Sequence, residues 1–119
     1  MTTTRQNKMR ELLKQEVSDI IMREIKDPRL GFLTVTDAEI TSDMRHARIF
    51  FTILGDEQER KQSMDVLKHA QHFVRQEFGK RVRMKTLPDI QFVYDDSVDR
   101  GVRIFELLEE IKKDEPEQT

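Results

Sequence analysis

The chain contains no cysteine and no tryptophan, and it has only four glycines and three prolines in 119 residues. The absence of cysteine excludes disulfides, thiolate metal sites and thiol nucleophiles. Four scattered glycines exclude a glycine-rich phosphate loop or a dinucleotide-binding fingerprint, and no serine, histidine and acid set suggests a nucleophilic enzyme. No apolar run approaches the ~20 residues that cross a bilayer, and the polar N-terminus lacks a signal-peptide core. We therefore expect a cytoplasmic protein with no membrane association, no cofactor and no catalytic residues.

Charged residues make up 37% of the sequence and hydrophobic residues 36%, and the formal net charge is −2. This length is typical of one domain with one core. We expect a single domain over residues 1–119, with an ordered core over about 5–112 and an acidic tail over 113–119. A slightly acidic chain can bind nucleic acid only through a local basic surface.

Apolar periodicity predicts three helices and three strands. Asp27-Pro28 ends the first helix, because the residue before proline is pushed out of the helical region. In the first strand the alternation changes phase, and a bulge near Asp37 would reconcile the two halves. The predicted elements are a helix from about Asn7 to Lys26, a strand from Phe32 to Ile40, a strand over about 47–53, a helix from Glu57 to Gly79, a strand over 82–94 and a short helix over 102–111.

The first two strands are close enough in sequence to form an antiparallel hairpin. The long helix shows Met64, Leu67, Val74 and Phe78 at the steps of a buried face, and Gly79 is a suitable left-handed C-cap. Strands backed by helices on one face predict a two-layer α+β domain.

The most informative stretch runs from Glu57 to Lys85. Between residues 68 and 85 six basic residues stand against one acid, Glu77. A skew of this kind is typical of a surface that follows a phosphate backbone, although an ordinary solvated surface is the alternative. The six are Lys68, Arg75, Lys80, Arg81, Arg83 and Lys85. Candidate additional RNA contacts are Arg5, Lys8, Arg10, Arg45 and Arg48, and only the fold decides whether they join the six.

Two further features allow other functions. His69 and His72 have a spacing that can converge on a metal, but without cysteine a third ligand would have to come from a distant residue. We expect surface histidines and no metal site. Residues 95–119 hold nine acids and four bases, so the alternative function is an acidic-tailed protein-interaction module without direct RNA binding.

Three motifs occur in a characteristic order between Thr4 and Ile111. They are Lys26-Asp27-Pro28-Arg29 after the first helix, Val35 through Ser42-Asp43-Met44 to Ala47, and Arg83 through Leu87-Pro88-Asp89-Ile90 to Phe92 and Asp95. In order and spacing they resemble the bacterial ribosome-binding factor A family. The resemblance implies a type II KH-like fold: helix, strand, strand, helix, kink, helix, strand, with a three-stranded mixed sheet and a C-terminal helix.

Ordinary KH domains clamp RNA with a GXXG loop between two helices. The resemblance implies instead an interhelical Ala-X-Gly kink, which falls on Ala70, Gln71 and His72 and would contribute to RNA binding. Here His72 replaces the glycine, so the freedom of φ that glycine provides is absent. Two alternatives remain open: a nearly continuous helix, or an unusual backbone conformation at His72.

The resemblance also implies a function. Members of the family associate with the free small ribosomal subunit, its 16S rRNA and neighbouring ribosomal proteins late in maturation. They support 16S rRNA end processing and growth in the cold, and no catalysis is attributed to them. We expect a monomer that binds one rRNA conformation preferentially and so shifts its population.

Overall fold

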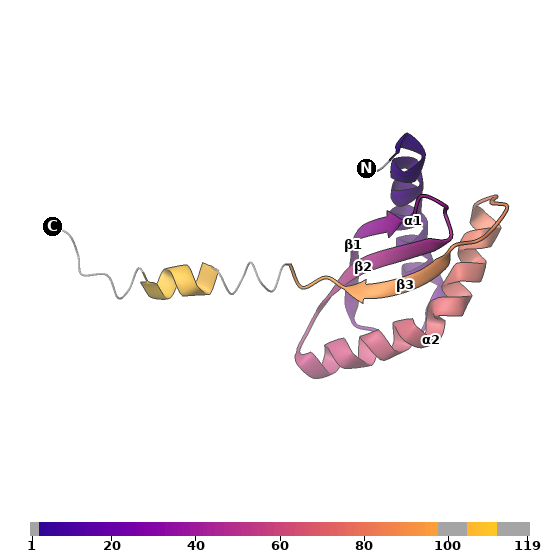
Figure 1. The fold of residues 1–119 in the computed structure, drawn as a ribbon. Coiled ribbons are helices and arrows are strands. Elements are labelled where there is room, and N and C mark those ends of the chain that lie inside the picture. Colours follow the sequence, from indigo (N-terminus) through magenta and orange to yellow (C-terminus); the bar gives the residue numbers. More distant parts are fainter. Residues whose placement is uncertain (1–2, 98–104, 112–119) are drawn as a thin grey trace.

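The computed structural model describes residues 3–97 and 105–111. Two long helices cover one face of a three-stranded sheet (Figure 1). In chain order the elements are α1 (Thr4–Glu24), β1 (Phe32–Ile40), β2 (His46–Leu54), α2 (Glu57–Arg81) and β3 (Asp89–Tyr94). This arrangement confirms the expected α+β class.

Helix α1 begins and ends at local signals. Thr3 is the N-cap, and it forms a reciprocal capping box with Gln6, which stabilises two otherwise unpaired backbone N–H groups. The helix begins three residues before the predicted start at Asn7 and ends at Glu24, two residues before the predicted end at Lys26. Asp27-Pro28 disfavours helix only at Asp27, so it limits the helix without setting its last residue. The Gln6 side chain also donates to the carbonyl of Ile40 at 3.0 Å, so the first turn of α1 is attached to the end of β1.

The sheet order is β1-β2-β3, with β1 antiparallel and β3 parallel to β2. The register shifts between Val35 and Asp37, which confirms the bulge predicted from the change of phase. The hairpin turn between β1 and β2 holds Met44 at a φ of 62°, the only positive φ of a non-glycine residue in the described ranges.

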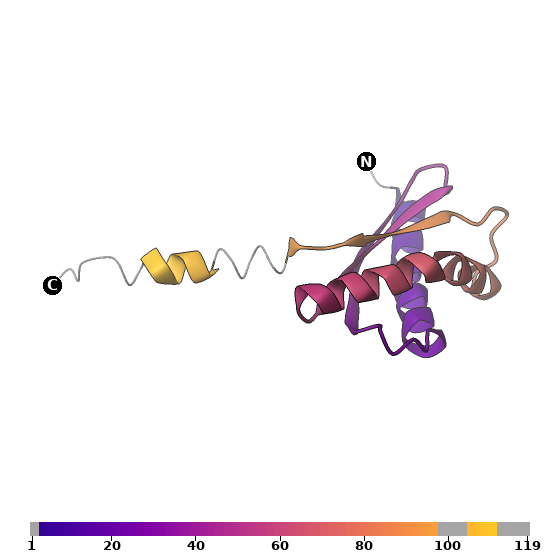
Figure 2. The ribbon, with the colours of Figure 1, turned by 90° about the horizontal axis from the view of Figure 1, so that it is seen from below.

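The core lies between the sheet and the two helices, whose layers are visible in Figure 2. Alternate residues of β2 point into it, because successive side chains of a strand face opposite sides. The buried apolar side chains come from α1, the sheet and α2; they include Leu13, Val17, Ile20, Ala38, Ile49, Phe51, Leu67, Val74, Phe78 and Ile90. The opposite face of the sheet carries no described helix.

Helix α2 is continuous over 25 residues but changes direction about halfway along (Figure 1). Its N-cap, Asp56, accepts from the Glu59 backbone at 2.8 Å. Met64, expected on the buried face, is 44% exposed, whereas Ser63 is buried. Ser63 can be buried because its hydroxyl accepts from the Gly31 backbone at 2.8 Å. His72 is not in a left-handed conformation, so the nearly continuous, bent helix is the alternative that holds.

Two predicted boundaries near the end of α2 are wrong. The helix continues past Gly79 to Arg81 and is capped by Val82 in an extended conformation. Gly79 instead lies against Leu87: a Cβ there would lie 2.6 Å from Cδ1 of Leu87, so the leucine side chain would have to move. Residues 82–88 form a loop, and β3 begins only at Asp89, because Pro88 cannot donate to a strand ladder.

Residues 105–111 are helical, in agreement with the expected short C-terminal helix. The first residues of that predicted helix and the acidic tail over 113–119 lie outside the described residues.

Candidate nucleic-acid interface

Three segments that are distant in sequence meet at one end of the sheet. The amide of Asp89 donates to the carbonyl of Arg45 at 2.8 Å, which places the start of β3 beside the β1–β2 turn. Gln6 attaches the first turn of α1 to the end of β1. We call this the basic end; it comprises the first turns of α1, the β1–β2 turn and the loop over residues 82–88.

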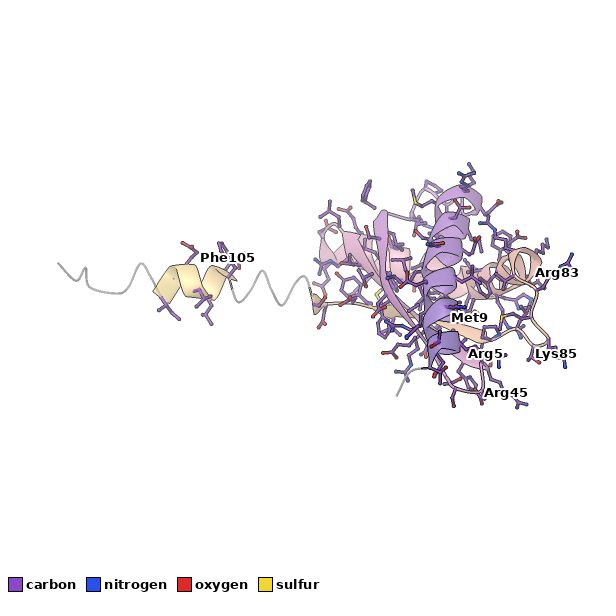
Figure 3. All side chains as sticks on the ribbon, turned by 90° about the horizontal axis from the view of Figure 1, so that it is seen from above. Arg5, Met9, Arg45, Arg83, Lys85 and Phe105 are labelled. Carbon is purple, nitrogen blue, oxygen red and sulfur yellow. The ribbon has the colours of Figure 1, made fainter. Side chains whose placement is uncertain are left out.

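Exposed cations from all three segments gather at the basic end. Figure 3 shows Arg5, Arg45, Arg83 and Lys85 on the same side of the domain, and all four side chains are exposed, as is Lys8 on α1. Within the described ranges none of the five forms an ion pair with a carboxylate. Arg45 interacts electrostatically with Asp43 without forming an ion pair. Cations that form no ion pair keep their donors available for phosphate oxygens.

Arg75 stabilises the loop over residues 82–88. Its Nε donates to the carbonyl of Pro88 and its Nη2 to the carbonyl of Leu87, each at 3.1 Å. Nε also lies 3.7 Å from Oδ1 of Asp89. Two of the guanidinium nitrogens therefore bond to the loop and are not available to a ligand in solvent. This makes Arg75 a positioning residue for Arg83 and Lys85.

Arg81, a predicted RNA contact, joins α2 to α1. Its Nη1 lies 2.6 Å from Asp19 and 3.0 Å from Glu16, and its Nη2 lies 3.9 Å from Glu24. The hydrogen bond from Arg81 is the main cause that holds the pKa of Asp19 below its ordinary value. Asp19 in turn is the first cause that raises the pKa of Arg81. The surface around Arg81 is thus acidic overall.

The other predicted residues of α2 lie beside β3. Lys68 is exposed and Gln71 is half-buried, and both line a hollow of about 490 Å³ between α2 and the outer edge of the sheet, with Phe92. The Gln71 side chain donates to the carbonyl of Ile90. Ala70 packs against the core. Gln71 and Ala70 therefore fix the middle of α2 to the sheet.

The remaining predicted cations take different places. Arg10 donates to the carbonyl of Ala38 at 2.7 Å and to Asp37 at 2.9 Å, so it stabilises the bulge. Lys80 pairs with Glu77 at 2.9 Å. Arg48 lies on the open face of the sheet, in the lining of a depression of about 430 Å³ that adjoins the basic end. His72 is exposed on α2.

Sequence reasoning treated the cations of residues 68–85 and those near the N-terminus as separate sets. The fold brings part of each set together. The parallel pairing of β3 with β2 would have predicted this. A strand parallel to β2 starts at the end where β2 starts, so the loop before β3, with Arg83 and Lys85, must lie next to the hairpin turn.

Two structural features concern metal binding and membrane insertion. No group of three or more metal-ligating side chains lies together in the described residues, and Nδ1 of His69 contacts the carbonyl of Asp65 at 2.7 Å. Over the same residues, no helix is long and apolar enough to span a bilayer.

The order α-β-β-α-β, with two helices on one face of a mixed three-stranded sheet, defines a type II KH-like domain. KH domains are nucleic-acid-binding modules. The family model described as ribosome-binding factor A matches residues 5–108. The chain belongs to the ribosome-binding factor A family.

Individual relatives agree with this assignment. A ribosome-binding factor A of Halothermothrix orenii is 49% identical over 115 residues, covering 97% of this chain and 94% of the relative. One of Desulfitobacterium hafniense is 47% identical over 115 residues, covering 97% and 92%.

Solved structures show the same fold. The crystal structure of ribosome-binding factor A from Thermus thermophilus superposes with a TM-score of 0.66 at 24% identity, covering 75% of this chain and 94% of that one. A homology model of the Thermus thermophilus factor, fitted into a cryo-EM map of its complex with the 30S subunit, has a TM-score of 0.63 at 24% identity, covering 73% and 91%.

Proposed function

We propose that this protein binds the free small ribosomal subunit late in its maturation, through 16S rRNA and neighbouring ribosomal proteins. Membership of the ribosome-binding factor A family supports ribosome binding. The family relative that was fitted into a 30S map supports the choice of subunit. The finer roles, in 16S rRNA end processing and growth in the cold, belong to the proposal, as do a cytoplasmic location, a monomeric state and the absence of a catalytic step.

The observation that carries the proposal is the gathering of exposed cations at the basic end. Arg83 and Lys85 extend from a loop that Arg75 holds in place. Arg5, Lys8 and Arg45 continue the surface across the β1–β2 turn to α1. Cations spaced over a rigid surface bind a folded RNA backbone by position as well as by charge.

The contact extends from the basic end along α2. His72 and Lys68 are exposed on the same helix as Lys80, and Lys68 reaches the hollow beside β3. The half-buried floor of this hollow, with Gln71 and Phe92, can accept a base or sugar edge next to the phosphates. Arg81 contributes by holding α2 to α1 and Arg10 by holding the bulge, rather than by contacting RNA.

Binding is the mechanism, with no covalent step. A factor that binds one rRNA conformation more tightly than others shifts the population of assembly intermediates towards that conformation, in proportion to the difference in affinity.

The first experiment measures binding of the purified protein to isolated small subunits, large subunits and naked 16S rRNA at several salt concentrations. We expect binding to small subunits that weakens steeply with salt, because phosphate contacts release counterions. Equal affinity for both subunits would exclude the proposed selectivity. Binding to neither would favour the alternative, in which the acidic C-terminal segment binds a basic protein.

A further inference from the structure

The helix over residues 105–111 exposes its apolar side chains. Phe105, Leu107, Leu108 and Ile111 are 64%, 57%, 56% and 49% exposed. At about 100° per residue, Leu107, Leu108 and Ile111 lie on one side of the helix and the glutamates at 106, 109 and 110 on the other. In proteins a helix owes most of its stability to the packing of its apolar face rather than to intrinsic propensity. This segment therefore needs an apolar surface to pack on.

A matching surface exists at the end of the sheet opposite the basic end. A groove of about 440 Å³ separates the last turns of α1 from the first half of β1. Its lining is mostly apolar: Ile21, Met22, Ile25, Leu30, Phe32, Leu33 and Val35. Met22 and Phe32 are 75% and 76% exposed. Large apolar side chains grouped on a surface mark an interaction site.

The covalent connection brings the helix within reach of this groove. Tyr94, near the end of β3, pairs in register with Phe51, which pairs in register with Val35 of the groove. Two strand spacings therefore separate the end of β3 from the groove, or about 10 Å. The eight steps from Ser97 to Phe105 can extend up to ~29 Å.

Charge also favours this pairing. Arg23, Lys26 and Arg29 are exposed around the end of α1. Arg23 and Arg29 have partners in Asp19 and Asp27, whereas Lys26 forms no ion pair within the described residues. A helix that buries its apolar side in the groove could bring one of its glutamates to Lys26, where opposite charges attract.

We propose that the groove between α1 and β1 is the docking surface for the chain's own helix 105–111. Docking in cis covers Met22 and Phe32 and gives the helix the apolar contact that stabilises it. The effective concentration of a tethered segment favours the same chain over a second copy. The proposal does not depend on ribosome binding.

The absence of cysteine makes distance measurement direct, because introduced cysteines are the only labelling sites. We would place nitroxide labels through Gln58→Cys, near the start of α2, and Glu109→Cys, on the polar side of the helix, in the full-length chain. Pulsed electron spin resonance should give one narrow distance distribution. A broad distribution in this parent protein would overturn the proposal.

Two variants and one matched control complete the test. Phe32→Ser in the groove and Leu108→Ser on the helix should each broaden the distribution. Leu54→Ser is the control, because Leu54 pairs with Phe32 across the strands and is also 76% exposed but does not line the groove. Equal behaviour of Phe32→Ser and Leu54→Ser would refute the assigned surface. Leu108→Ser keeps the test valid if Phe32→Ser does not fold.

Dilution of the labelled protein with an excess of unlabelled chain separates cis from trans docking. A distance within one chain persists on dilution, and we expect that result. Loss of the narrow distribution on dilution would mean that the helix docks on a second copy, which would overturn docking in cis.

Discussion

At Gly79, α2 lies against Leu87 of the loop over residues 82–88. A Cβ at this position would lie 2.6 Å from Cδ1 and 2.8 Å from Cδ2 of Leu87. In open space alanine would stabilise a helix interior by about 1 kcal/mol relative to glycine. Here the contact with Leu87 opposes that gain, because an overpacked side chain must move and displace its neighbours.

We expect Gly79→Ala to lower the free energy of unfolding by about 1 kcal/mol, since overpacking outweighs helix propensity. In a Leu87→Ala background the same substitution should instead raise it by about 1 kcal/mol. Urea unfolding of the four proteins measures both effects. If Gly79→Ala stabilised the protein in both backgrounds, Leu87 would not be the reason for the glycine.

Asp27 holds the turn after α1 through its ionised carboxylate. It accepts from the Arg29 backbone at 2.9 Å and from Nη2 of Arg29 at 2.8 Å. The Arg29 side chain, then its backbone N–H, lowers the pKa of Asp27 from 3.8 to about 2. A depressed carboxyl pKa stabilises the folded state fully above the ordinary pKa and loses this effect as pH falls through the folded value.

Asp27→Asn should therefore flatten the dependence of stability on pH between about 4 and about 2. The measurement is the urea midpoint at a series of pH values for the parent and the variant. Arg29→Ala should flatten the same window in part, because it removes the side-chain donors to Asp27 and keeps the backbone N–H. Parallel curves for parent and Asp27→Asn would show that the carboxylate is not linked to folding.

At the level of elements, the cations at the end of α2 and in the loop after it differ in whether they form ion pairs with carboxylates. Arg81 lies among three carboxylates of α1, whereas Arg83, two residues later, has no carboxylate partner in the described ranges. Arg81 and Arg83 offer matched variants that separate stabilisation of the fold from the proposed binding of RNA.

We expect Arg81→Ala to lower the midpoint of thermal unfolding and to leave the salt dependence of small-subunit binding unchanged. The double substitution Arg83→Ala and Lys85→Ala should leave the midpoint unchanged, weaken binding and reduce the salt slope by about 1–2. Circular dichroism and equilibrium binding give the two readouts. A reversed pattern would move the RNA surface from the basic end to the contact between α1 and α2.

Helix α2 shows how an element can bend without glycine. It stays helical through Ala70, Gln71 and His72. At this point Gln71 bonds to Ile90 of β3 and Ala70 packs on the core. These side-chain contacts hold the middle of the helix on the sheet, and no residue there has a left-handed conformation.

Over the whole molecule, one end of the sheet is basic and the other exposes large apolar side chains. One end gathers cations from three segments, and the other exposes Met22, Phe32 and Leu54. The parallel pairing of β3 with β2 creates this separation, because the loop that precedes β3 and the hairpin turn must lie at one end and the segment after β3 at the other. Phe32→Ser should consequently leave the salt dependence of subunit binding unchanged.

Local signals in the sequence determined the elements of this protein. Asp27-Pro28 placed the end of α1 to within two residues, alternation marked β1 and β2, and a change of phase placed the bulge near Asp37. Asp56 was a sufficient cap for α2. Each of these depends on residues a few positions apart, so the chain itself carries the information. The skew towards basic residues over 68–85 was visible for the same reason.

Only the tertiary structure decided what the basic residues do. Arg81 meets Asp19 across 62 positions of sequence, and the Arg45 carbonyl meets the amide of Asp89. Gly79 lies inside α2 against Leu87, and it does not cap the helix end. Whether a basic side chain forms an ion pair within the protein or stays available to RNA depends on which segment packs beside it. The packing of the whole core determines which segments are neighbours.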